Sequence, residues 1–290
     1  MQKILTKLAV FVFLFYSAIC RAAVDDQALW RQSADLQEGL AGMWRVSGVR
    51  VSAGISLAPS YKWNDPRLLG RFFTLSREKI ENDTPEREQC SQPRILFRKM
   101  NLKTLLQATL PMAEGTDIAS AYELPKSVGK DVEVGWISCS NSTFGPDLND
   151  PDDEKKLPPR ATAWLLNLSD NEKDTEKLAL LWYDWTILIL DRVPTDAKPD
   201  PSFHCAQARS QTEHAICASL PLASFDRSVS EAYKMAENNC DSDSICRKKR
   251  HKQQTAWINK RDKCGADTQC LISTMQDRVE QLMELSVSPE

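Results

Sequence analysis

The sequence predicts an α+β protein of two domains, an N-terminal antiparallel β-barrel or sandwich followed by a small α-helical domain with disulfide bonds. Residues 23–194 consist of short apolar stretches separated by Pro, Gly, Asn and Asp, which is typical of strands and turns. Residues 201–290 carry apolar side chains at helical spacing, and the polar segment 195–200 separates the two parts as a linker. Eight cysteines follow a predicted export signal, so we expect them to form disulfides.

The predicted export signal is residues 1–22, and a ninth cysteine, Cys20, leaves with it. Lys3 and Lys7 provide a positive start, residues 8–19 carry no charge, and Ala22 ends a small-residue cleavage pattern. The apolar run is shorter than the about 20 residues that a transmembrane helix needs, which favours a cleaved signal over an uncleaved anchor. We see no later segment apolar enough to span a bilayer. We therefore expect a periplasmic or secreted protein without a transmembrane segment after cleavage.

Charge and motifs narrow the function classes. The chain has 37 Lys+Arg and 40 Asp+Glu, and loss of Lys3, Lys7 and Arg21 with the signal leaves a net charge near −6. This acidity argues against nucleic-acid binding and suits a basic protein partner. No serine-hydrolase elbow, P-loop, metallopeptidase helix or CxxC pair is present in the sequence. We therefore assign no catalytic residue, no cofactor and no metal.

In the first domain, the clearest predicted strands are the apolar runs 44–49, 72–75, 132–137 and 163–168. A β-hairpin is predicted over residues 178–193, where two apolar runs flank Asp184 and Trp185. Many short strands with regular turns predict a sandwich or a small barrel, and the pattern does not choose between them. Segment 147–159 is interpreted as a solvated acidic loop, because it lacks the glycine and the terminal glutamate of an EF-hand calcium loop.

Four helices are predicted in the second domain. Ser210 and Glu213 match a capping box that begins a short helix reaching Cys217. Pro221 marks the start of the second helix. The third runs from about residue 244 to 261, and Asp267 caps the fourth.

The cysteines of the second domain lie at its predicted turns. Many pairings are possible, but sequential pairing would connect the two sides of each turn. The two cysteines left in the first domain should pair with each other. The expected disulfides are Cys90–Cys139, Cys205–Cys217, Cys240–Cys246 and Cys264–Cys270.

Two polar groups in the second domain have a functional and a structural interpretation. His204, His214 and His251, with Cys205 and Cys217, resemble a zinc set, but the spacing is not that of a zinc finger and an oxidising compartment competes for the thiols. The basic run 247–252 could bind phosphate or anionic lipid. We favour the interpretation that this run is a solvated helix face.

The second domain resembles the family named after the lysozyme inhibitor LprI, over residues 201 to about 285. The matching positions include Phe203, Glu213, Asp226, Tyr233, Gln254, Trp257, Arg261 and Arg278. His204 departs from the family pattern, which usually has Asp there, and Cys240 with Cys246 is an additional pair beside the family's four cysteines. The resemblance implies an α-helical, disulfide-bonded domain in an exported protein, and inhibition of lysozyme as known for few members.

The first domain more weakly resembles lipocalin-like (calycin) barrels. Gly42 and Trp44 form a Gly-x-Trp at the first predicted strand, and Arg192 ends the last one. In those barrels a basic residue from the last strand packs over that tryptophan, so the resemblance implies that Arg192 covers Trp44. The alternative is an unrelated sandwich in which Trp44 is an ordinary core residue.

Together these features predict an exported, non-enzymatic protein that binds and inhibits a cell-wall hydrolase of the lysozyme type through a rigid disulfide-bonded surface. An immunity protein against a secreted toxin is a close variant. A carrier that holds a small ligand or lipid inside the barrel is an alternative from another class, and an enzyme of unrecognised type is a third. Large side chains filling the barrel would argue against the carrier, and an open apolar cavity would argue for it.

Overall fold

The structure is a computed structural model of the 290-residue chain. It describes residues 34–52, 60–110, 117–124, 131–140, 144–146, 148, 161–169 and 176–286. The predicted signal, residues 1–22, and nearly all of the acidic segment 147–159 lie outside the described residues.

An antiparallel sheet forms the first part of the molecule. Its nine strands in the described residues are β1 (Gly42–Arg50), β2 (Phe72–Leu75), β3 (Lys79–Asn82), β4 (Cys90–Ser91), β5 (Arg94–Asn101), β6 (Asp131–Ser138), β7 (Ala163–Asn167), β8 (Lys177–Trp182) and β9 (Thr186–Arg192). The spatial order is β4-β3-β2-β1-β9-β8-β7-β6-β5, so the strands follow chain order around the sheet and the first pairs with the last.

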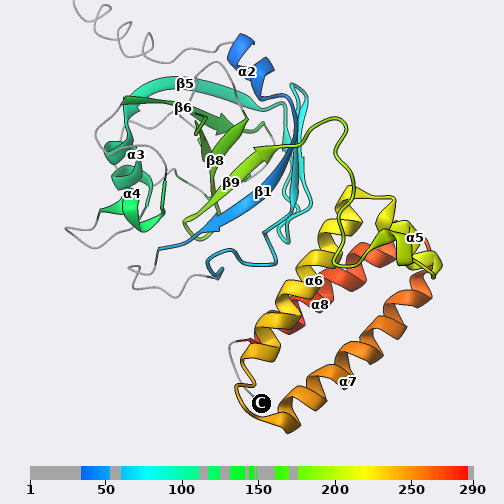
Figure 1. The fold of residues 1–290 in the computed structure, drawn as a ribbon. Helices are drawn as coiled ribbons and strands as arrows, with labels where there is room; N and C mark the ends of the chain where they lie inside the picture. The colour runs from blue at the N-terminus through cyan, green and yellow to red at the C-terminus, as the bar shows by residue number, and fades with distance from the viewer. Residues whose placement is uncertain are drawn as a thin grey trace, which may run out of the picture.

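The sheet curls into a partial barrel, which agrees with the barrel alternative rather than with a sandwich of two sheets (Figure 1). The break in the ladder lies between β4 and β5. There the Cys90–Cys139 disulfide joins β4 to the residue that follows β6, and the Ser140 amide donates to the Ser91 carbonyl oxygen at 3.2 Å. The disulfide thus spans the break.

Both faces of strands β6–β9 are buried. The concave face contributes to a core around the fully buried Trp44, Phe73 and Trp182. The convex face is covered by α3 (Leu102–Thr109) and α4 (Ile118–Ala121), which pack on Trp136 and Trp164. Burial on both faces explains why these strands are near-continuous apolar runs in the sequence.

Three helices of this part correct the prediction of strands alone over 23–194: α2 (Ala34–Leu40), α3 and α4. For α3 the sequence does contain the signal. Asn101 caps its first turn through Oδ1, and Leu102, Leu105 and Leu106 recur at helical spacing on the buried face. The other predicted strands and the β8–β9 hairpin are confirmed, with Asp184 and Trp185 at positive φ (51° and 54°), as a two-residue hairpin turn requires.

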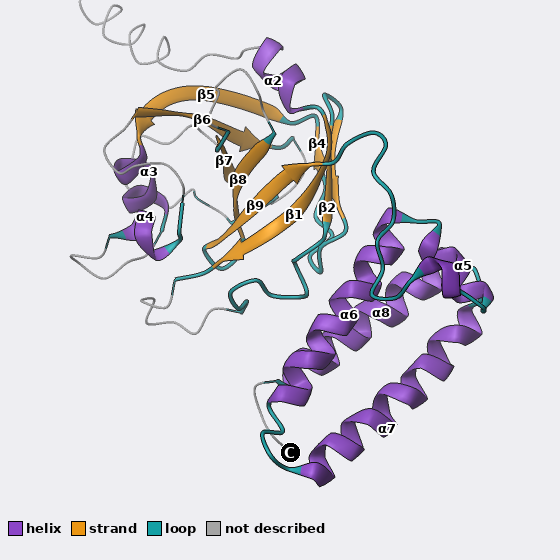
Figure 2. Cartoon of the chain, in the orientation of Figure 1, coloured by secondary structure: helices purple, strands orange, loops and turns teal. Residues whose placement is uncertain are grey.

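The second part contains α5 (Gln211–Cys217), α6 (Leu220–Asn238), α7 (Ser244–Arg261) and α8 (Thr268–Leu285), with short 3₁₀ turns at Cys205–Gln207 and Asp262–Cys264. All four predicted helices are confirmed. The caps at Ser210, Asp243 and Asp267 each accept backbone N–H bonds as their sequence positions require. Helices α6 and α8 pack side by side, whereas α7 stands away from them over much of its length (Figure 2).

The helices contact the sheet through a fully buried arginine. The Arg71 guanidinium lies over the Phe225 ring of α6, with Cζ 3.3 Å from the ring centroid, and donates to Ser228 Oγ at 3.1 Å. Ser224 Oγ donates to the Gly70 carbonyl oxygen at 2.6 Å. Burial lowers the pKa of Arg71 to about 10, so this cation stays charged at neutral pH. Nothing in the sequence pattern marks Arg71 as buried.

None of the helices in the described part of the chain combines the length and apolar character that a bilayer-spanning segment requires.

Candidate functional site

The four predicted disulfides are all present. Their Cα–Cα separations are 5.2 Å for Cys90–Cys139, 5.7 Å for Cys205–Cys217, 5.6 Å for Cys240–Cys246 and 5.6 Å for Cys264–Cys270. The Cys205–Cys217 bond removes both thiolates from the zinc set considered above, and no group of three metal ligands occurs among the described residues. Each of the other two disulfides of the helical part closes a turn between two helices.

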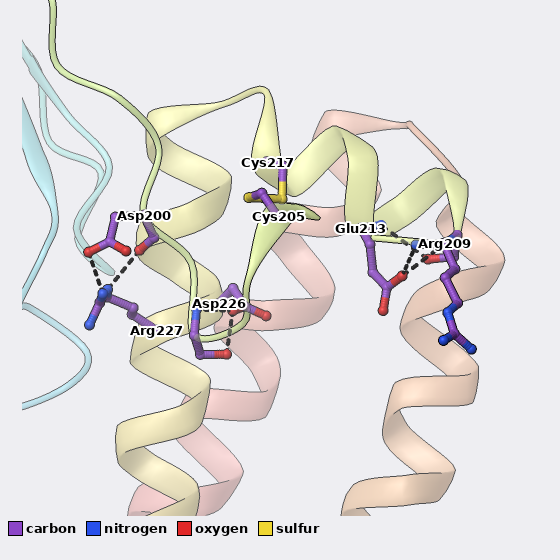
Figure 3. Close-up of a disulfide and its surroundings, with 9 residues drawn as sticks. Asp200, Cys205, Arg209, Glu213, Cys217, Asp226 and Arg227 are labelled. Carbon is purple, nitrogen blue, oxygen red and sulfur yellow. Dashed lines mark hydrogen bonds and ion pairs between the residues drawn. A yellow bond between two sulfur atoms is a disulfide. The ribbon is translucent and has the colours of Figure 1, made fainter. Parts of the chain in front are cut away.

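The residues of the LprI-like pattern hold the helical part together. Figure 3 shows two of them, Glu213 and Asp226, beside the Cys205–Cys217 disulfide. Glu213 Oε2 accepts from the backbone N–H groups of Arg209 and Ser210, and these bonds hold the pKa of this carboxyl below its ordinary value. Together with the bond from the Glu213 N–H to Ser210 Oγ they complete the predicted capping box.

Asp226 links three segments at a buried position on α6. Its Oδ2 accepts from the Ser202 N–H at 2.8 Å and from Ser202 Oγ at 2.6 Å, which ties the entry segment to α6. Its Oδ1 pairs with Arg261 Nη1 of α7 at 3.4 Å, and both side chains are buried. Phe203, the neighbour of Ser202, packs against the apolar core of the helices.

Trp257 brings α7 and α8 together. Its Nε1 donates to the Thr274 carbonyl oxygen at 3.3 Å, and Arg261 and Arg278 lie 5.5 and 5.9 Å from its ring centroid. Gln254 Oε1 accepts from Arg278 Nε at 3.0 Å and from Nη2 at 2.9 Å. Tyr233 packs half-buried against the core of the helices. Trp257, Arg261 and Arg278 are buried, and Gln254 and Tyr233 are half-buried, so these positions contribute to the packing of the helices.

The basic run corrects one interpretation. Arg247, Lys248, Lys249 and Lys252 are exposed, as a solvated helix face requires, but Arg250 is only 2% exposed. Among the described residues of α7 the buried ones are Arg250, Trp257 and Arg261, so the buried face of this helix consists of two arginines and one tryptophan. The sequence contained a signal for this buried face, because spacings of seven and four residues place all three side chains on one side of a helix.

An exposed apolar side chain projects from the turn that joins α6 to α7. Ile245 is 77% exposed and lies between Cys240 and Cys246, whose disulfide closes this turn. We call residues 240–246 the α6–α7 tip; it lies at the lower end of the helices in Figure 1. Asp241 and Asp243 of the tip are also exposed.

In the sheet, Trp44 and Arg192 meet as predicted. They are paired residues of β1 and β9, and the Arg192 Cζ lies 4.3 Å from the Trp44 ring centroid. The space inside the curled sheet is occupied by large side chains, of which Trp44, Phe73 and Trp182 are fully buried. A cavity beneath α2, beside Leu75 and Ile80, has a volume of about 10 Å³. By the criterion stated above, this packing weighs against a ligand carrier.

Glu86 was not found by sequence reasoning. Its carboxylate accepts from the Tyr61 hydroxyl and, at 3.2 Å, from Trp182 Nε1, so it caps one end of the apolar interior. Burial, followed by the hydrogen bond to Glu86, raises the pKa of Tyr61 well above its ordinary range. The arrangement satisfies two polar groups of aromatic side chains.

No protein-family model matches the chain, and neither a curated protein nor a solved structure matches it. The resemblances to LprI-like domains and to calycin barrels therefore stay predictions.

Proposed function

We propose that this chain is an exported, non-enzymatic protein that binds and inhibits a cell-wall hydrolase of the lysozyme type. Export through residues 1–22 to the periplasm or beyond is part of the proposal, and the four disulfides support it because such bonds persist in oxidising compartments. The resemblance to LprI-like domains supports the target class.

The observation that carries the proposal is the disulfide-closed α6–α7 tip with its exposed Ile245. A hydrolase that cleaves a polymer has a concave cleft, and a projecting tip is the complementary shape. Because the Cys240–Cys246 bond already restricts the turn, little conformational freedom is lost on binding. An isoleucine that leaves water at the centre of an interface can provide an apolar anchor.

Charge supports the same kind of partner. Residues 201–290 contain twelve Lys and Arg and twelve Asp and Glu, so the whole acidic surplus of the chain after residue 22 lies in residues 23–200. Lysozyme-type hydrolases are commonly basic, and an acidic partner gains association rate by electrostatic steering. In this proposal the sheet part attracts the enzyme and the tip of the helical part engages it.

The proposal is tested with residues 23–290 in a lysozyme assay. Ile245→Ser should weaken inhibition about tenfold or more, since truncating a buried interface anchor costs about 2 kcal/mol. Ile258→Ser is the matched control, because Ile258 lies on the same helix, away from the tip, and is 36% exposed. Equal inhibition by the Ile245→Ser and Ile258→Ser variants would show that Ile245 does not contact the hydrolase. If residues 23–290 inhibit no lysozyme and capture no cell-wall hydrolase, the proposed function is wrong.

A further inference from the structure

Two buried arginines of the helical part have no acidic partner among the residues that the structure describes. Arg250 of α7 is 2% exposed and Arg278 of α8 is 5% exposed. No ion pair of either residue occurs within the described part of the chain. By contrast Arg261, on the same face of α7 as Arg250, pairs with both Asp226 and Asp262. A buried cation without a counter-charge is costly, so this pair needs an explanation.

Neutral amides take all the hydrogen bonds that the structure gives these two guanidinium groups. Arg278 donates to Gln254 and Gln281, and Arg250 donates to Gln253 at 3.3 Å. The Arg250 Nε is buried and has no hydrogen-bond partner among the described residues. Burial, and then the positive charge of Arg250, lower the pKa of Arg278, which is consistent with two cations in proximity. The region thus carries positive charge that no ion pair within the described residues neutralises.

A cavity of about 520 Å³ opens between α7 and α8 beside this pair. Arg278 lines it directly, and Gln253, which accepts from Arg250, lines it too. The remaining wall includes Trp257, Ala256 and Leu285, and it also includes the exposed Lys260, Asp277 and Glu284. The volume is in the range of sites for small organic molecules.

We propose that this cavity binds a small organic oxyanion, with a phosphate or carboxylate head on Arg278 and an apolar or aromatic body along Trp257, Ala256 and Leu285. Gln254 accepts from Nε and from one N–H of Nη2, and Gln281 accepts from one N–H of Nη1. One N–H therefore remains on each terminal nitrogen, and together these two match either kind of head in a planar, two-point contact. Arg250 donates to Gln253 in the cavity wall and so adds a second positive charge near the head. The bound anion supplies a counter-charge that no ion pair within the described residues provides. The site is formed by α7 and α8, contains no residue of the α6–α7 tip and does not depend on the proposed inhibition.

The test uses residues 23–290 and three probes: phenyl phosphate, benzoate and the uncharged benzyl alcohol. Binding is followed by calorimetry and by the NMR signal of the Trp257 indole N–H. Either anion should bind and move this signal, and the alcohol should bind at least about tenfold more weakly, because hydrogen bonds to charged groups are the stronger ones. The phosphate and carboxylate arms decide which head the site prefers.

The variants are Arg278→Met, Arg250→Met and the control Lys252→Met. Arg278→Met should weaken anion binding about tenfold or more, and Arg250→Met severalfold, whereas Lys252→Met, an exposed position on the same helix, should leave it unchanged. Without anion, Arg250→Met should unfold at the same or a higher temperature than the parent, because it removes an unpaired buried charge. A purely structural arginine would give the opposite shift.

Two results would overturn the site. One is failure of both anions to bind the parent chain with a Kd below about 1 mM. The other is unchanged anion binding by Arg250→Met, which keeps the proposal testable even if Arg278→Met fails to fold. Because the readout is ligand binding and melting temperature, neither result bears on lysozyme inhibition.

Discussion

The Arg192 guanidinium lies over the Trp44 indole, 4.3 Å from the ring centroid, and also donates to the backbone carbonyl oxygens of Gly39 and Ala41. The indole Nε1 in turn donates to the Leu40 carbonyl oxygen at 2.9 Å. One side chain from the end of β9 therefore fastens the segment that leads into β1. This contact lies where the first and last strands of the chain pair, in the middle of the strand order.

Replacing Arg192 should loosen the attachment of β9 to the segment before β1. Arg192→Ala should lower the free energy of unfolding by about 2 kcal/mol, since it removes a cation–π contact and hydrogen bonds from a charged donor. Arg192→Lys should recover only part of this, because an ammonium cannot lie flat on the indole and donate to two carbonyls together. Urea unfolding measures both. Arg45→Ala, at an exposed position of β1, is the control and should change stability by less than about 0.5 kcal/mol.

Local signals explain which features were predicted correctly. The Ser210–Glu213 capping box and the Asp184-Trp185 turn depend on residues close in sequence, and both formed as expected. The Trp44–Arg192 contact joins residues far apart in the sequence, and it was expected because the resemblance to calycin barrels implied it. Helix α3 was not predicted, although Asn101 caps it, because its residues lie in a part of the sequence for which only strands were expected.

The burial of individual cations was not predictable from the same patterns. Arg71 is buried because the loop before β2 docks on α6, and Arg250 because it lies on the side of α7 that also carries the buried Trp257 and Arg261. Both events depend on how distant segments pack. In the sequence Arg250 is one charge within a basic run, and Arg71 is a single charge between apolar residues, so neither context indicates where the side chain lies. The candidate anion site therefore emerged only from the three-dimensional arrangement.

Gly70 should be essential for docking the helices on the sheet. It has a φ of +83°, and a Cβ at this position would collide with Ser224 Oγ of α6. Gly70→Ala should therefore destabilise the protein by about 2 kcal/mol or more, through backbone strain and a forced separation. Thermal unfolding and hydrogen exchange of α6 measure the effect.

Two comparisons test this explanation of the Gly70 effect. Gly39→Ala should be neutral or slightly stabilising, because Gly39 sits in helix α2 and a Cβ added there would have no atom within 4 Å. Adding Ser224→Ala to Gly70→Ala should restore part of the stability, since it removes the colliding hydroxyl. Equal losses in the Gly39 and Gly70 variants would show that close approach to α6 is not the cause.

The capping box should give α5 a pH-dependent contribution. The pKa of Glu213 is lowered in the folded state by bonds from the Arg209 and Ser210 backbone N–H groups. A lowered folded pKa stabilises the fold above the unfolded value, 4.5, and this stabilisation is lost as pH falls through the folded pKa. Glu213→Gln should therefore be less stable than the parent at pH 7, by about 0.5 kcal/mol, and should match it in strong acid.

Melting temperatures across the acid range measure the Glu213 difference. Glu231→Gln is the control, because the ion pair of Glu231 with Lys234, one turn along α6, is exposed. A gap between parent and Glu213→Gln that stays constant from neutral pH into strong acid would contradict the charge-dependent explanation.

The association and dissociation rates of the hydrolase should depend on different parts of the chain. The acidic surplus lies in residues 23–200, so added salt should slow association steeply between about 0.05 and about 0.5 M, where the screening length becomes shorter than the separation of exposed charges. Dissociation should change little with salt.

Ile245→Ser should show the reverse pattern, with faster dissociation and nearly unchanged association, because an apolar anchor acts after encounter. Stopped-flow or surface-binding kinetics with a basic lysozyme give both rates. Lys248→Gln with Lys252→Gln makes the chain more acidic and should speed association. Association that is insensitive both to salt and to these two lysines would remove the steering argument and leave the tip alone to support the proposed function.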